Sequence, residues 1–166
     1  MTDPTPWPTV VALSGDPQIG SRTAHVARRA AAALARTLEE QPTVVEIDLA
    51  NVSARDRDLR RAVLHARAVI VATPERDGWA ATGLLEFLGG FRLGSLGGVP
   101  AAIVVHAADG DRGWTAERRL ARYLDELGAD PSLPSLVLDA VADDIPGAIA
   151  GWVAEATRRP ARATAA

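Results

Sequence analysis

Residues 14–23, which read SGDPQIGSRT, include the side chains of this sequence best suited to bind a ligand. They follow a short apolar run, and from Ser21 onward apolar residues recur at helical spacing. The first turn of a helix presents unpaired backbone N–H groups and the positive end of the helix dipole, and both favour an anion. Ser21 and Thr23 add hydroxyl donors, and Arg22 adds positive charge. The segment therefore predicts a phosphate site, with one alternative, in which Ser21 serves only as the helix cap.

Several other chemistries lack the residue types that they require. The chain has no cysteine, which excludes disulfides, thiolate nucleophiles and cysteine-ligated metal sites. All 18 basic residues are arginine, so there is no lysine for a Schiff base or for a Walker A phosphate loop. There is no GxGxxG motif, and the 3 histidines fall in three different predicted elements. The sequence therefore offers no acid–base or metal-binding constellation.

The composition is that of a globular protein. The 166 residues are 48% hydrophobic and 23% charged, and the net charge of −3 gives no reason to expect nucleic acid or an anionic membrane as a partner. The N-terminus lacks the regions of a signal peptide, and no apolar run approaches the roughly 18 residues of a membrane span. We expect a cytoplasmic protein with a single domain over residues 1–166, a core over 9–159 and a flexible tail over 160–166.

Strands and helices are predicted to alternate along the chain. Apolar runs predict five strands, over residues 10–14, 43–48, 68–73, 100–105 and 135–138. Helical spacing predicts a helix from Ser21 that Pro42 closes, helices over 55–66, 82–91 and 115–127, and a last helix from Ile145 that Pro160 ends. Residues 74–81 and 106–113 are expected to form loops. The strand at 68–73 is apolar throughout, which is typical of a strand buried on both faces.

Five alternating strand–helix units predict an α/β fold in which helices cover both faces of a parallel sheet. Right-handed crossovers then favour a flavodoxin-like three-layer sandwich, with a five-stranded parallel sheet of order 2-1-3-4-5. In such a sheet the ligand binds at the carboxyl ends of strands one and three, where the winding reverses. The predicted phosphate segment lies at that position.

Three segments of the chain resemble one enzyme family in their order and spacing. They are the phosphate segment, the ATP-x-x-x-G pattern at 72–78 and the LGGVPAAIVV run at 96–105. Together they resemble NADPH-dependent FMN reductases, above all those that supply reduced flavin in sulfonate assimilation and related two-component monooxygenase systems. The resemblance covers about residues 10–138.

This resemblance implies an NAD(P)H-dependent flavin reductase that uses FMN and NADPH or NADH. It further implies a homodimer or homotetramer and a flavin-dependent monooxygenase as partner. The FMN phosphate would lie in the first loop and the ring between the loops after strands three and four. The flavin-binding residues by position are Ser14, Asp16, Ser21, Arg22, Thr23, Pro74, Glu75, Arg76, Asp77, Gly78, Trp79, His106 and Ala107. No catalytic side chain is expected, because the cofactors carry the chemistry of hydride transfer.

Asp16 departs from the family, whose members read Gly-Ser-Pro where this chain reads Gly15-Asp16-Pro17. A carboxylate about 4 Å from a phosphate costs about 1 kcal/mol in bulk water and about 4 kcal/mol at an effective dielectric of 20. The helix dipole returns only about 0.3–1 kcal/mol. Asp16 must therefore point away from the phosphate, be offset by Arg22, or weaken FMN binding.

Arg76 is a second departure, since the family has a tyrosine beside the ring at this position. Trp79 could replace that aromatic contact, or it could pack at an oligomer interface. His106, at the end of strand four, could approach a flavin or form a simple hydrogen bond at the strand end.

Three functions remain open at this point. One is the flavin reductase described above. Another is an enzyme that retains FMN and reduces a quinone, azo compound or other small acceptor. The last is a flavin-free partner subunit without enzymatic activity, which the departures at Asp16 and Arg76 keep open.

Overall fold

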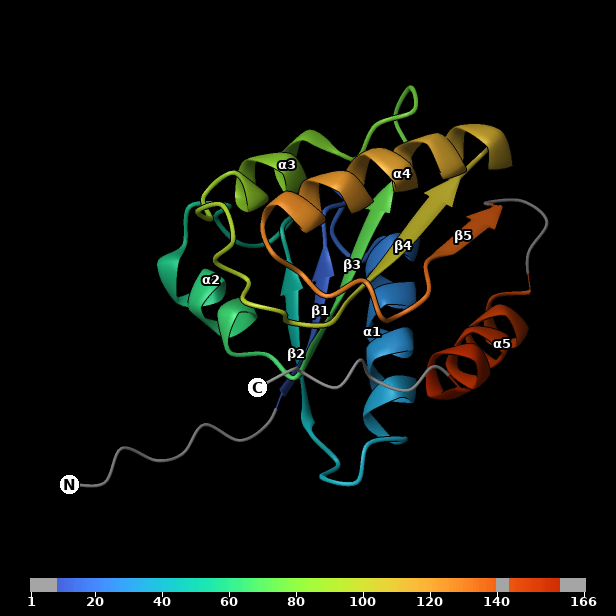
Figure 1. The fold of residues 1–166 in the computed structure, drawn as a ribbon. Helices are drawn as coiled ribbons and strands as arrows, with labels where there is room; N and C mark the ends of the chain where they lie inside the picture. The colour runs from blue at the N-terminus through green and yellow to red at the C-terminus, as the bar shows by residue number, and fades with distance from the viewer. Residues whose placement is uncertain (1–8, 140–143, 159–166) are drawn as a thin grey trace.

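Five parallel strands alternate with five helices in the computed structural model, which describes residues 9–139 and 144–158 (Figure 1). The strands are β1 (Thr9–Ser14), β2 (Thr43–Asp48), β3 (Ala68–Pro74), β4 (Ala101–Ala107) and β5 (Leu136–Asp139). The helices are α1 (Arg22–Ala35), α2 (Arg57–Leu64), α3 (Thr82–Leu88), α4 (Gly110–Glu126) and α5 (Ile145–Arg158).

The sheet has the order β2-β1-β3-β4-β5, which confirms the predicted topology. Ser14, the last residue of β1, is in register with Asp48 of β2 and with Ala72 of β3. Pro74 at the end of β3 is in register with His106 of β4. From β1 the chain passes to β2 on one side and then crosses back to β3 on the other side of β1. The direction of winding therefore reverses between β1 and β3, at their carboxyl ends.

Each face of the sheet has its own apolar core. Val10 and Ala12 of β1 pack with α1 and α5, whereas Val11 and Leu13 pack with α2, α3 and α4. This split follows from the alternation of side chains along a strand. Every residue of β3 is buried, as predicted for a strand covered on both faces.

The predicted loop over 106–113 is wrong. Residues 106–107 belong to β4, and α4 begins at Gly110, five residues before the predicted start. Asp109 caps this helix, since its carboxylate accepts hydrogen bonds from the amides of Asp111 at 2.9 Å and Arg112 at 3.4 Å. Gly113, which suggested a loop, is instead a packing residue. A Cβ there would lie 2.6 Å from Cγ1 of Val137, so only glycine allows this close approach.

The first helix ends earlier than predicted, at Ala35 and not at Pro42, because turn bonds from the Thr37 and Leu38 amides replace the helical pattern there. The remaining boundaries shift by one to three residues. The helix predicted over 55–66 begins after Asp56, whose carboxylate accepts the amides of Asp58 and Leu59. The helix predicted over 82–91 ends at Leu88. Pro160 and the tail over 160–166 lie outside the described residues. Among the helices that the structure describes, none is long and apolar enough to cross a membrane.

Candidate functional site

The loop between β1 and α1 leaves the sheet at the point of winding reversal and is fixed at its root by both neighbouring strands. The Gly15 amide donates to the Ala72 carbonyl at 2.8 Å, and the Ser14 carbonyl accepts the Leu49 amide at 3.0 Å. Gly15 also lies against α3, because a Cβ there would be 2.5 Å from Cβ of Leu84. Residues 17–20 are exposed. The loop therefore has a rigid root and an open tip.

Asp16 organises this loop. Its side chain is buried, with the residue only 7% exposed, and its Oδ1 accepts the Gln18 amide at 3.0 Å. This bond from an aspartate to the amide two residues on is an Asx turn. The Asp16 amide in turn donates to Oγ of Ser14 at 3.4 Å. The carboxylate thus has a structural role in this loop.

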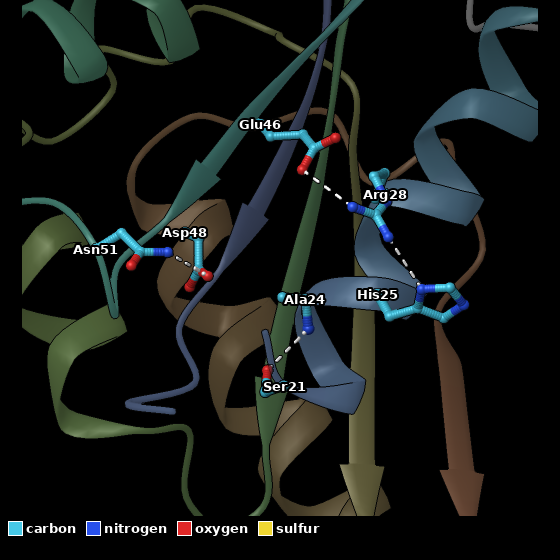
Figure 2. Close-up of polar contacts among 7 residues, drawn as sticks. All are labelled: Ser21, Ala24, His25, Arg28, Glu46, Asp48 and Asn51. Atoms are coloured by element: carbon cyan, nitrogen blue, oxygen red, sulfur yellow. Dashed lines mark hydrogen bonds and ion pairs between the residues drawn. The ribbon is translucent and has the colours of Figure 1, made fainter. Parts of the chain in front are cut away.

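The head of α1 keeps hydrogen-bond donors available for an anion. Oγ of Ser21 accepts the Ala24 amide at 3.1 Å, so Ser21 does cap the helix (Figure 2). A serine hydroxyl that accepts one bond still has its own hydrogen to donate. Within the described part of the chain, the amides of Gly20, Ser21 and Thr23 form no hydrogen bond. These amides and the Ser21 hydroxyl offer four donors at the positive end of α1.

Not every predicted phosphate residue reaches the open side of the loop. Arg22 is exposed beside it. Thr23 and Ser14 are only 1% and 2% exposed, so both side chains lie inside the domain. Two of the three hydroxyls of this segment, those of Ser14 and Thr23, are therefore closed off from a ligand on the open side of the loop.

The loop after β3 is a tight hairpin that projects beyond the end of the strand (Figure 1). Arg76 and Trp79 exchange both of their backbone hydrogen bonds at 2.9 Å. Asp77 and Gly78 between them have φ angles of 52° and 75°, which identifies a type I′ turn. Oε1 of Glu75 accepts the Gly78 amide at 2.6 Å and closes the turn from inside.

Arg119 of α4 holds this hairpin from the side. Its Nη1 donates to the Gly78 carbonyl at 2.7 Å, and its guanidinium carbon lies 4.0 Å from the centre of the Trp79 ring. Trp79 remains 52% exposed. The Asp-Gly pair is a local signal from which the turn could have been predicted. Arg119 is 41 residues from Gly78 in the sequence, and no local pattern indicates its role.

The ends of β3 and β4 lie side by side, as the predicted ring site requires. The Glu75 amide donates to the His106 carbonyl at 2.9 Å, and His106 is half-buried. Ala107, in contrast, is 2% exposed and belongs to the core beneath α4. The structure thus brings Pro74, Glu75 and His106 together and places Ala107 away from any open wall.

A cleft of about 470 Å³ lies on the β2 side of the first loop, between α1 and the end of β2. Its lining includes Ser21, Ala24, His25 and Arg28 from the α1 side and Glu46, Asp48 and Asn51 from the β2 side, and Figure 2 shows Arg28 reaching across to Glu46. Ile19, Gly20 and Val52 complete the lining. Apart from Ser21, none of these residues was assigned to a site from the sequence. No group of three or more possible metal ligands occurs within residues 9–139 and 144–158.

Comparison with known proteins identifies the fold. No family model matches the chain, and no curated protein does. The apo form of an NADH:FMN oxidoreductase, EmoB, matches with a TM-score of 0.72 and 20% identity over 93% of this chain and 91% of that one. A flavodoxin from Streptococcus pneumoniae matches with a TM-score of 0.63 and 18% identity, over 90% and 94%. An FMN-dependent NADH-azoreductase from Bacillus anthracis, in complex with FMN, matches with a TM-score of 0.61 and 12% identity, over 90% and 97%. The chain therefore has the flavodoxin-like α/β fold, with five parallel strands in the order 2-1-3-4-5.

Proposed function

We propose that this chain is an NAD(P)H-dependent flavin reductase that binds FMN at the carboxyl ends of β1, β3 and β4 and supplies reduced FMN to a partner monooxygenase. The observation that carries the proposal is the group of donors at the head of α1. The amides of Gly20, Ser21 and Thr23, which form no hydrogen bond within the described residues, and the Ser21 hydroxyl lie at the point of winding reversal. The structural likeness to an NADH:FMN oxidoreductase and an FMN-dependent azoreductase supports the same conclusion.

These residues fit a phosphate monoester. A dianionic phosphate has several oxygens that each accept hydrogen bonds, and charge-assisted bonds from backbone amides are among the stronger ones in proteins. Arg22 lies exposed beside the loop and adds a positive charge near the proposed phosphate site. When bound, FMN would supply the ring that accepts hydride from the nicotinamide.

The hairpin fits the second half of the task, which is to position a ring. Glu75 and Arg119 fix the hairpin backbone before any ligand arrives, so little ordering is required on binding. Trp79 offers an exposed aromatic surface in place of the tyrosine that the family has at position 76. His106 and Pro74 lie at the adjacent strand ends and would form the floor of the ring site.

Asp16 favours a reductase that releases its flavin over one that retains it. Its carboxylate is fixed in the phosphate loop by the bond to the Gln18 amide. A like charge near the phosphate weakens binding, and reduced FMN must leave in order to reach a partner. An enzyme that retains FMN and reduces a quinone or azo compound is the second candidate, supported by the likeness to the azoreductase.

Two measurements test this proposal. Isothermal titration of the purified chain with FMN and with riboflavin should give one FMN site per chain and weaker binding of riboflavin, which lacks the phosphate. Steady-state oxidation of NADH and NADPH should then be faster with free FMN as acceptor than with a quinone or an azo dye. Absence of FMN binding up to about 1 mM would contradict both enzyme candidates and favour the flavin-free subunit. A faster reaction with the quinone or dye would favour the second candidate.

A further inference from the structure

The cleft between α1 and the end of β2 is continuous with the phosphate loop. Ile19, Gly20 and Ser21 line the cleft and also form the tip of that loop. Its volume of about 470 Å³ is within the range of small-molecule sites. A ligand whose phosphate rests on the loop amides could therefore extend into the cleft, away from the hairpin.

Asp48 presents a fixed carboxylate to this cleft. Its Oδ1 accepts the Ala50 amide at 3.2 Å, and its Oδ2 accepts Nδ2 of Asn51 at 3.0 Å (Figure 2). A carboxylate has about four lone-pair sites, so each oxygen keeps one for a ligand. Two acceptors on one carboxylate match the vicinal 2′- and 3′-hydroxyls of a ribose. A carboxylate near the phosphate loop binds the ribose in dinucleotide-binding α/β folds for this reason.

The charges in the cleft favour an uncharged nucleoside over a second phosphate. Among the described residues that line the cleft, Arg28 is the one arginine, and it lies 3.7 Å from a carboxylate oxygen of Glu46 and 3.1 Å from Nδ1 of His25. The carboxylates of Glu46 and Asp48 in this lining thus outnumber its one guanidinium by two to one. A phosphate on the ribose would meet this excess negative charge.

Two exposed apolar side chains complete the match to a nucleoside. Ile19 is 74% exposed and Val52 is 38% exposed, and both line the cleft. A purine ring has two apolar faces and a polar edge, so it buries apolar surface against side chains of this kind. Neither side chain contributes to the two apolar cores of the domain.

We propose that this cleft binds the adenosine half of a dinucleotide, with the 2′,3′-diol of the ribose on Asp48 and the 5′-phosphate directed toward the loop tip. The proposal rests on the proposed function only for the other half of the ligand, which would reach the flavin site. Both FAD and NADH contain this adenosine 5′-diphosphate group. NADPH carries a phosphate on the 2′-oxygen, and the Asp48 carboxylate disfavours it.

Binding of ADP and of adenosine 2′,5′-bisphosphate to the full chain tests the role of Asp48. The unaltered chain is expected to bind ADP about tenfold more tightly than the bisphosphate. Asp48→Asn should reduce this ratio to near one, because asparagine keeps an oxygen for the Ala50 amide but loses the charge and an acceptor. Asp125→Asn, which removes the same charge from an exposed position on α4, should leave the ratio unchanged.

Asn51→Ala is a second variant that keeps the test decisive if Asp48→Asn fails to fold. Asn51 is exposed, and Asn51→Ala removes its hydrogen bond to Asp48 but keeps the Asp48 carboxylate. The ratio of ADP affinity to bisphosphate affinity should therefore fall less than in Asp48→Asn. No binding of ADP would overturn the proposal. An unchanged ratio in every variant that folds, or an equal fall in Asp125→Asn, would do the same.

Two further arms identify the dinucleotide. If it is FAD, the chain binds FAD more tightly than FMN, and Asp48→Asn removes the advantage. If it is NADH, the FMN-loaded chain oxidises NADH in preference to NADPH, and Asp48→Asn removes that preference. Asp48-dependent binding of ADP without FMN binding would support the cleft and contradict the flavin reductase. FMN binding without Asp48-dependent binding of ADP would do the reverse.

Discussion

The β1–α1 loop and the β3–α3 hairpin lie at the same edge of the sheet but are held by different kinds of contact. The first loop is fixed at its root by backbone bonds to β2 and β3 and by the packing of Gly15 against α3. The hairpin is closed by its own bonds and tied to β4 by the Glu75 amide, and the Arg119 side chain of α4 then braces it from the side. Backbone donors suit the recognition of a phosphate, whereas a braced aromatic hairpin suits the placement of a ring.

This comparison predicts that substitutions in the two regions will separate by ligand. Changes in the first loop should affect FMN more than riboflavin, since only FMN has a phosphate. Changes at the hairpin should affect both flavins alike, because they share the ring.

The largest effect is expected from Gly15→Val. A Cβ at this position would lie 2.5 Å from Cβ of Leu84, an atom that cannot move without α3. Overpacking of this kind should lower the free energy of unfolding by about 3 kcal/mol or more. Gly83→Val on α3 is the matched control, since a Cβ there meets no atom within 4 Å. Urea denaturation measures both variants, and equal stability of the two would show that the root of the loop is not tightly packed.

Ser21→Ala should weaken FMN binding by about 1.5–3 kcal/mol, the value of a hydrogen bond to a charged group. It also removes the helix cap, which costs about 0.5–2 kcal/mol of stability. Ser21→Gly separates the two effects, because glycine at an N-cap costs only a few tenths of a kcal/mol. Titration with FMN and riboflavin is the measurement. Equal losses for the two flavins would mean that Ser21 acts only as a cap.

Asp16→Asn should tighten FMN binding by at least about 1 kcal/mol, the value in water for charges 4 Å apart. Asparagine keeps the oxygen that accepts the Gln18 amide, so the variant removes the charge and keeps the turn. The gain should shrink as salt is added, because screening weakens the repulsion. Asp16→Ser, which also removes the charge, should give a gain in the same direction. Unchanged or weaker FMN binding in both variants would show that the charge does not face the phosphate.

The smallest effect is expected from Arg119→Ala. The variant loses the exposed contact with Trp79, worth about 0.5–1 kcal/mol, and the hydrogen bond to the Gly78 carbonyl. Both contacts brace the hairpin and neither touches the phosphate, so the loss should appear equally in FMN and riboflavin affinity. Arg122→Ala is the control, since Arg122 is exposed on the same helix and pairs with Glu126, away from the hairpin. A larger loss for FMN than for riboflavin would remove the distinction between the two regions.

The fold could be predicted from the sequence because each strand–helix unit has a local signal. The alternation of apolar runs with helical spacing gave the strand order, and the apolar strand at 68–73 was correctly assigned to the centre of the sheet. The start of α4 could not be predicted in this way. Gly113 is required by contact with Val137, 24 residues later in the chain, and not by a turn.

The candidate site likewise contains parts that a local sequence signal predicts and parts that depend on packing between elements. The loop at 14–23 was located because the anion-binding property of a helix start depends on neighbouring residues. The buried positions of Thr23 and Ala107 depend on packing between elements, which the sequence does not display. The cleft beside Asp48 joins α1 to the end of β2, and its residues form a site only once the sheet brings Asp48 into register with Ser14.

The fixed root of the first loop limits the entropic cost of ligand binding and affects its rate. Bonds from Gly15 and Ser14 to the adjacent strands leave only residues 17–20 exposed for a ligand to order, and Pro17 already has a restricted φ. Fixing the backbone of one residue costs about 1–2 kcal/mol, so the entropic cost of closing this loop is confined to three or four residues. Association should then proceed without a slow conformational step. Its kinetics should be single-exponential, with an observed rate constant that rises linearly with ligand concentration.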